Sequence, residues 1–183
     1  MSDEALRTHV LEAAPAELRR LRNQGERALA QVTRDDDLEA VLDGESNSLG
    51  VLVRHLAGNM HSRWTDFLTS DGEKPGRDRE GEFDRGKRMD RAELVAVWND
   101  GWDRVFQALA ALGPADVDAR VRIRGEELSV LEAILRQVAH YAGHVGQIVF
   151  LAKHLEARAE RPFPSLSIPR GQSRARWPYR GRP

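Results

Sequence analysis

The hydrophobic positions of this chain recur at helical spacing in four segments, which predicts four helices. Three of the segments begin at good N-capping residues, Asn47-Ser48, Asp90 and Ser129, and in the last two a Glu follows three positions later. Pro15 lies inside the first segment and predicts a kink or a restart of that helix. The four segments are residues 4–31, 47–68, 90–112 and 129–157.

The connections between the segments are short except for one. Residues 121–128 alternate around a glycine and predict a short β-hairpin before the fourth helix. Residues 69–89 form a long charged connection, for which a functional loop and a mobile loop are equally open interpretations. Residues 161–183 are rich in proline and arginine and lack periodicity, which predicts a non-helical tail. We therefore expect an all-α fold in which residues 1–160 form one antiparallel four-helix bundle.

Composition narrows the chemistry that the chain can perform. Its 183 residues are enough for one domain with its own core. The absence of cysteine excludes disulfides, thiolate metal sites and a cysteine nucleophile. A formal net charge of −1 gives no reason to expect a nucleic acid or an anionic membrane as partner. The start of the chain lacks the features of a secretory signal and no apolar run suggests a membrane span, so we expect a cytoplasmic protein.

Three histidines, His55, His140 and His144, are the candidate functional residues. A spacing of four puts His140 and His144 on one face of a helix, one turn apart. Two imidazoles from one helix and a third from another form a tripod that can hold a divalent metal with one side open.

Helical wheels place none of these three histidines at the centre of an apolar stripe, which argues against core histidines. A metal site at the edge of a groove and ordinary surface histidines both remain open. The apolar stripe predicted for the fourth helix is Leu131, Ile134, Leu135, Val138, Tyr141, Ala142, Val145, Val149 and Ala152.

Neighbouring polar side chains extend the candidate site. Asn59 lies one turn beyond the first histidine, and Gln147 points close to the direction of the histidine pair, so either amide is a candidate to orient an imidazole or a bound water. Arg54, Arg63 and Arg124 are candidates for holding an anionic group of a cofactor. Solvated surface arginines are an equally open interpretation for these three. The sequence assigns no catalytic residue.

Several segments together resemble the DinB-like superfamily, in an uncharacterised branch of it. The resemblance covers the chain from about Leu18 to Ser173. It rests on residues 55–60, 62–64, 71–75, 140–148 and 167–173, together with Asn47-Ser48 and Arg124-Gly125-Glu126.

This resemblance implies an up-down-down-up four-helix bundle, which is often a homodimer, with the tail folded back over it. It also implies a divalent metal, zinc or nickel, held by His55, His140 and His144. The implied function is a thiol S-transferase, in which the metal activates a low-molecular-weight thiol such as bacillithiol or mycothiol for attack on a small-molecule substrate. A metal-dependent hydrolase of small molecules and a non-catalytic metal-binding stress-related protein are the alternatives.

Overall fold

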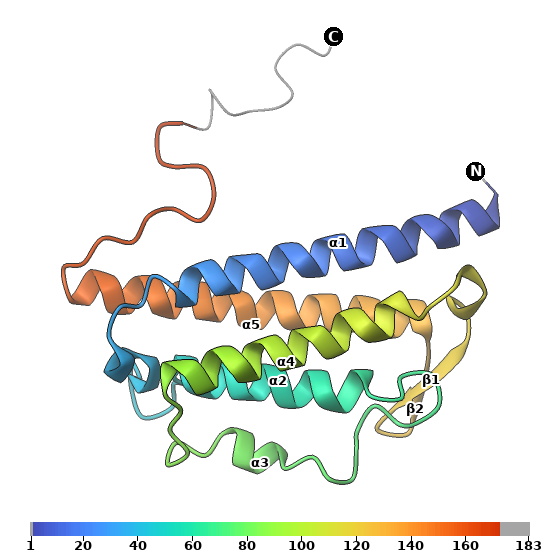
Figure 1. Ribbon diagram of the computed structural model, residues 1–183, viewed down its shortest axis with the longest axis horizontal. Coiled ribbons are helices and arrows are strands. Elements are labelled where there is room, and N and C mark those ends of the chain that lie inside the picture. The colour runs from blue at the N-terminus through green and yellow to red at the C-terminus, as the bar shows by residue number, and fades with distance from the viewer. Residues whose placement is uncertain (1, 173–183) are drawn as a thin grey trace.

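The computed structural model describes residues 2–172, in which four long helices pack side by side (Figure 1). α1 and α5 run in one direction and α2 and α4 in the other, so the order along the chain is up-down-down-up. The expected all-α bundle is thereby confirmed. Within these residues, no helix is both long and apolar enough to cross a membrane. The helices are α1, Asp3–Leu29; α2, Leu49–Trp64; α4, Arg91–Ala110; and α5, Val130–Arg158.

Short-range hydrogen bonds set the ends of these helices. The Ser48 side chain caps α2, and Asp90 and Ser129 each form a reciprocal capping box with the Glu three residues later. α2 ends earlier than predicted because Thr65 already has extended backbone angles. α1 contains Pro15 without interruption, so the helix does not restart there.

The core lies between the four helices and contains two linked hydrogen bonds between buried side chains. The rings of Trp102 on α4 and Tyr141 on α5 pack edge to face, with centroids 5.6 Å apart. The Tyr141 hydroxyl accepts the indole N–H of Trp64 at 2.8 Å and donates to Asn59 Oδ1 at 3.2 Å. Because these polar groups are buried, their mutual hydrogen bonds fix how α2 and α5 align.

The buried face of α5 differs from the predicted stripe. Gln137 and Ile148 are buried, whereas Leu135, 58% exposed, and Ala142 face away from the bundle. The assignment of Leu135 and Ala142 to the core was therefore wrong. α5 is apolar or small on more than one face, and periodicity alone does not tell which face packs inward.

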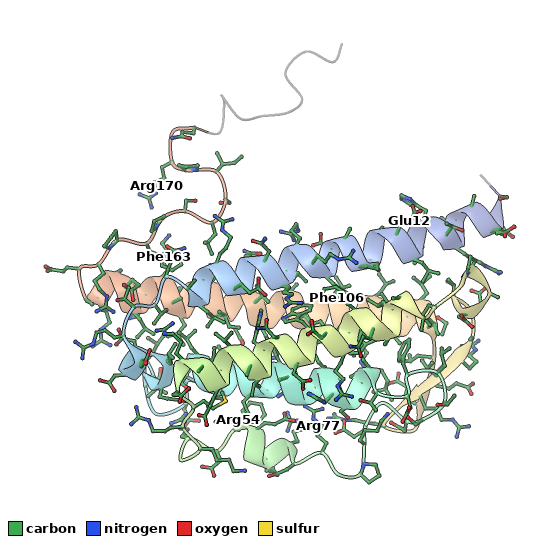
Figure 2. All side chains as sticks on the ribbon, in the orientation of Figure 1. Glu12, Arg54, Arg77, Phe106, Phe163 and Arg170 are labelled. Atoms are coloured by element: carbon green, nitrogen blue, oxygen red, sulfur yellow. The ribbon has the colours of Figure 1, made fainter. Side chains whose placement is uncertain are left out.

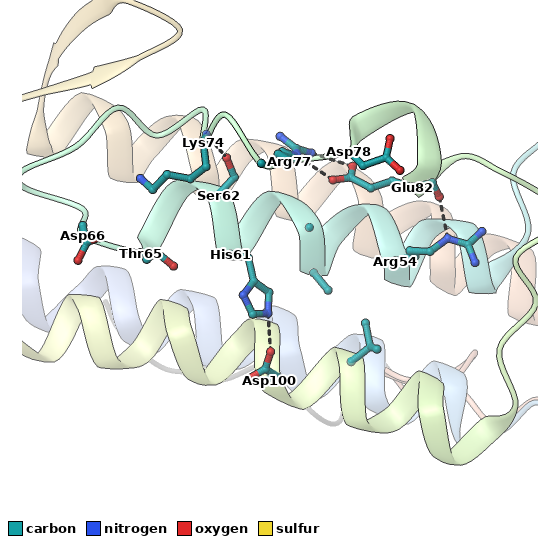
Figure 3. Close-up of a pocket in the computed structure, with 14 residues that line it drawn as sticks. Arg54, His61, Ser62, Thr65, Asp66, Lys74, Arg77, Asp78, Glu82 and Asp100 are labelled. Carbon is teal, nitrogen blue, oxygen red and sulfur yellow. Dashed lines mark hydrogen bonds and ion pairs between the residues drawn. The ribbon is translucent and has the colours of Figure 1, made fainter.

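The long connection between α2 and α4 is an ordered segment, residues 65–90, which we call the crossover. Because α2 and α4 run in the same direction, the chain must return along the bundle before α4 begins (Figure 1). A single helical turn, α3, Arg79–Glu82, forms part of it. Arg54 of α2 donates hydrogen bonds to three carbonyl groups of the crossover, one of them that of Glu82 at 2.9 Å (Figure 3). These bonds fasten the crossover to the bundle.

The predicted hairpin is present before α5. β1, Arg120–Ile123, pairs antiparallel with β2, Glu126–Ser129. The two turn residues, Arg124 and Gly125, have φ angles of 57° and 77°, as a type I′ turn requires. The Asp71 carboxylate accepts the backbone N–H groups of both turn residues, at 2.9 and 2.7 Å. The crossover therefore holds the hairpin turn in place.

The tail is non-helical as far as the structure describes it. Arg161 donates two hydrogen bonds to the buried Glu156 carboxylate, at 2.6 and 2.9 Å, and also contacts Asp37. Phe163 packs against the edge of the core. Residues 173–183, the rest of the predicted tail, lie outside the described residues.

Candidate metal centre

Three imidazoles meet between α2, α5 and the crossover. His55 projects from α2, and His140 and His144 project from consecutive turns of α5. The His55 ring centroid lies 5.5 Å from that of His140 and 4.9 Å from that of His144. The centroids of the α5 pair lie 4.6 Å apart. One nitrogen of each ring lies within 4.8 Å of the others, so the fold brings the three candidate residues together.

Each of the three histidines has a ring nitrogen without a hydrogen bond to the described residues. His55 Nδ1 lies 2.9 Å from Glu82 Oε2, and His144 Nδ1 lies 2.8 Å from Gln147 Oε1. These oxygens only accept, so Nδ1 carries a proton in both rings and Nε2 is the nitrogen that is left for a metal. His140 Nε2 is buried and has no hydrogen-bond partner among the described residues. An orphaned imidazole nitrogen beside two others fits a metal site.

Glu82 of the crossover covers His55 from outside the bundle. Both side chains are buried there, which explains why a residue at the edge of the α2 stripe is not exposed. Arg77 donates Nε and Nη2 to the two Glu82 carboxylate oxygens, at 2.7 and 2.8 Å (Figure 3). Burial raises the pKa of Glu82, but the hydrogen bonds from His55 and Arg77 outweigh it and hold the pKa below its ordinary value. Glu82 is therefore an ionised carboxylate fixed against the imidazole.

The surroundings also favour the neutral form of the two α5 imidazoles, His140 and His144. Burial, with the neighbouring His144 and His55, lowers the pKa of His140 to about 4. Burial likewise lowers the pKa of His144. The neutral ring is the form that binds a metal, so protons compete weakly for these nitrogens at neutral pH. Donor type, convergence and protonation state all fit, and the group can hold a divalent metal ion.

A cavity of about 330 Å³ opens beside the three histidines. α2, the crossover, the hairpin turn and α5 all contribute to its wall. Three protein ligands leave at least one coordination position on a metal, and the cavity offers room for a small molecule at that position. Apart from the histidines, its charged lining residues within the described range are all arginines: Arg63, Arg77, Arg79, Arg124 and Arg136.

Of the other candidate residues, three line the cavity beside the histidines and one lies at a second cavity. Arg63 and Arg124 line the cavity. Asn59 lines it too, but its Oδ1 accepts the Tyr141 hydroxyl, and none of the described hydrogen bonds joins it to an imidazole. Arg54 lies elsewhere, bound to crossover carbonyls, at a second cavity of about 590 Å³ between α2, α4 and the crossover (Figure 3). Arg54 therefore lies apart from the histidine cavity, and its candidate role in holding an anionic group of a cofactor stays a prediction.

A family model described as protein of unknown function (DUF1572) matches residues 5–172, which include the histidines, the crossover and the hairpin. The chain belongs to the DUF1572 family. No curated protein and no solved structure matches it. The family description assigns no activity, so the function of this DUF1572 protein has to be argued from its geometry.

Glu82 and Arg77 are residues of the DUF1572 site that the sequence did not reveal. They lie in a segment without periodicity, and only the tertiary fold brings Glu82 to His55 and Arg77 to Glu82. Figure 2 labels Arg77 beside the crossover. One signal was present, Gly58 in the interior of α2. A Cβ at this position would collide with the Glu82 carboxylate, so glycine leaves the room that Glu82 needs. Glycine inside a helix costs about 1 kcal/mol relative to alanine, and its presence there often marks such a close approach.

Proposed function

We propose that this protein is a metal-dependent enzyme of the DinB-like superfamily. A divalent ion at His55, His140 and His144 would activate a low-molecular-weight thiol or water for attack on a small electrophile. The observation that carries the proposal is the convergence of three imidazoles, with His140 Nε2 unpaired among the described residues, beside a cavity. The up-down-down-up order of the helices supports the superfamily.

The residues of the chain hold the ion and prepare its ligands. When bound, a divalent ion lowers the pKa of a thiol or water that coordinates it. Glu82 accepts the Nδ1–H of His55, which fixes the tautomer that presents Nε2 and makes that nitrogen a better donor. Gln147 orients His144 in the same way, through a neutral amide. Because the chain has no cysteine, a transferred sulfur would come from a thiol cofactor.

Elemental analysis after loading with zinc or nickel tests the metal centre. His140→Ala removes one of three ligands and should abolish stoichiometric binding. His154→Ala is a matched control, because His154 lies on the same helix but stacks on Phe150, away from the cluster. Equal metal content in the parent and in His140→Ala would refute the metal centre.

Turnover of a generic electrophile tests the reaction class. Product that requires bacillithiol, mycothiol or glutathione supports the thiol S-transferase, and product with water alone supports the hydrolase. Metal binding without turnover under either condition supports the non-catalytic alternative. The open cavity favours an enzyme, because a purely structural metal has all its positions filled by the protein.

A further inference from the structure

We propose that the cavity beside the histidines binds an anionic small molecule, one that carries a carboxylate or phosphate group, through the arginines at its rim. The inference rests on the function proposed above, because the anion would be the substrate or the thiol cofactor placed next to the ion. It adds the chemical class of that molecule.

The charge of the cavity wall is one-sided. Its five arginines come from α2, the crossover, the hairpin turn and α5, which are far apart in the sequence. No Asp or Glu side chain of residues 2–172 lines it. A cleft lined by charges of one sign concentrates ligands of the opposite sign. A divalent ion at the histidines would add to the same positive field.

Two of these arginines are part of the wall itself. The Arg77 side chain is only 4% exposed, binds both Glu82 oxygens and lies 3.5 Å from Glu73. Arg63 is also buried, donates to the Gly72 carbonyl and contacts Glu73 at 3.0 Å. Their hydrogen bonds within the protein hold both guanidinium groups in place, so they supply fixed charge and shape.

The other three arginines, Arg79, Arg124 and Arg136, are about half exposed and available to a ligand. Arg136 contacts Glu126 through Nη1 at 2.8 Å, and Arg124 contacts Glu73 through Nε at 3.0 Å. The carboxylate nearest to Arg79 is 3.6 Å away. Exposed ion pairs of this kind add little stability. Ligand oxygens can therefore bind the remaining guanidinium N–H groups, and a guanidinium suits the paired oxygens of carboxylate and phosphate.

Titration calorimetry with inorganic phosphate on the zinc-loaded, full-length protein tests this inference. Phosphate should bind, and neutral trimethyl phosphate should not. Arg124→Gln and Arg136→Gln should each weaken phosphate binding about tenfold, the loss expected for one charge-assisted hydrogen bond. Arg158→Gln, at the exposed end of α5 and away from the cavity, should bind phosphate like the parent. Because all variants keep the histidines, a contribution of zinc to phosphate binding is common to them.

An unchanged phosphate affinity in both cavity variants would overturn the inference, as would equal binding of the neutral ester. Zinc content is measured on the same samples, so the two proposals fail separately. If phosphate binding depends on the arginines but the protein binds no zinc, the anion site is supported and the metal enzyme is refuted. If the protein binds zinc but phosphate binding does not depend on the arginines, the metal centre is supported and the anion site is refuted.

Discussion

Replacing Glu82 by Gln tests whether the crossover takes part in metal binding. The substitution keeps the size of the side chain but removes its charge and turns one oxygen into an NH2 group. One carboxylate oxygen accepts from His55 and Arg77, and the other accepts from Arg77. In either orientation of the amide, its NH2 group therefore faces an N–H donor.

Two effects of different size follow for Glu82→Gln. Loss of a carboxylate that orients a metal-bound histidine lowers metal affinity about 10- to 100-fold, or about 1.4 to 2.7 kcal/mol. Breaking a buried ion pair by removing one partner costs about 3 to 5 kcal/mol of folding stability. We expect the loss of folding stability to be near the lower end of this range, because Arg77 still has the Glu73 carboxylate 3.5 Å away. The free energy of unfolding of a domain is about 5 to 15 kcal/mol, so the variant should still fold.

Competition with a chromophoric chelator measures zinc affinity, and urea denaturation without metal measures the free energy of unfolding. Glu80→Gln is the matched control, because Glu80 lies in the same turn of α3 and its side chain is almost fully exposed. This control should match the parent in both measurements. If Glu82→Gln bound zinc as tightly as Glu80→Gln, Glu82 would have no part in the metal centre.

Three further changes probe other contacts. Tyr141→Phe leaves the buried Trp64 N–H without its acceptor and should lower the free energy of unfolding by about 1 to 3 kcal/mol; an unchanged urea midpoint would contradict this. Asp71→Ala removes the acceptor of both hairpin-turn N–H groups and should speed their hydrogen exchange, measured by NMR, while equal rates in the parent would refute it. Hydrogen bonds from Arg161 hold the pKa of Glu156 below its ordinary value of 4.5. The stability from Glu156 is therefore present above pH 4.5 and lost as the pH falls through the folded pKa, so Glu156→Gln should be less stable at neutral pH and approach the parent in acid. A stability difference that did not shrink in acid would count against this.

The helices and the histidine pair were predictable because their signals are local. Ser48, Asp90 and Ser129 cap helices through hydrogen bonds that reach only three residues ahead. His140 and His144 share a face of any helix that contains both. Such features do not depend on how the helices are arranged, so the sequence pattern suffices for them.

Gln147, one turn beyond the pair on the same helix, was predictable for the same reason, but the crossover residues around the histidines were not, for the opposite reason. Glu82 reaches His55 from another part of the chain, in a segment with no periodic pattern. Its position depends on the path of the crossover, which exists because α2 and α4 run in the same direction. The sequence pattern of neither helix predicts that path. For α5, both Ile148 and Leu135 belong to apolar faces, and only the packed bundle decides that Ile148 turns inward.

The crossover is longer than the return from the end of α2 to the start of α4 requires. α4 has 20 residues, which span about 30 Å, and an extended chain covers that distance with about nine residues. Residues 65–90 thus contain far more chain than the return needs, and lengthening a loop adds little entropic cost, about 0.6 kcal/mol for each doubling. The surplus is the part that coils into α3 and brings Glu82 to His55. Variants with a shortened crossover should therefore keep the four-helix scaffold yet lose this carboxylate, which makes the scaffold and the outer wall of the pocket separable units for redesign.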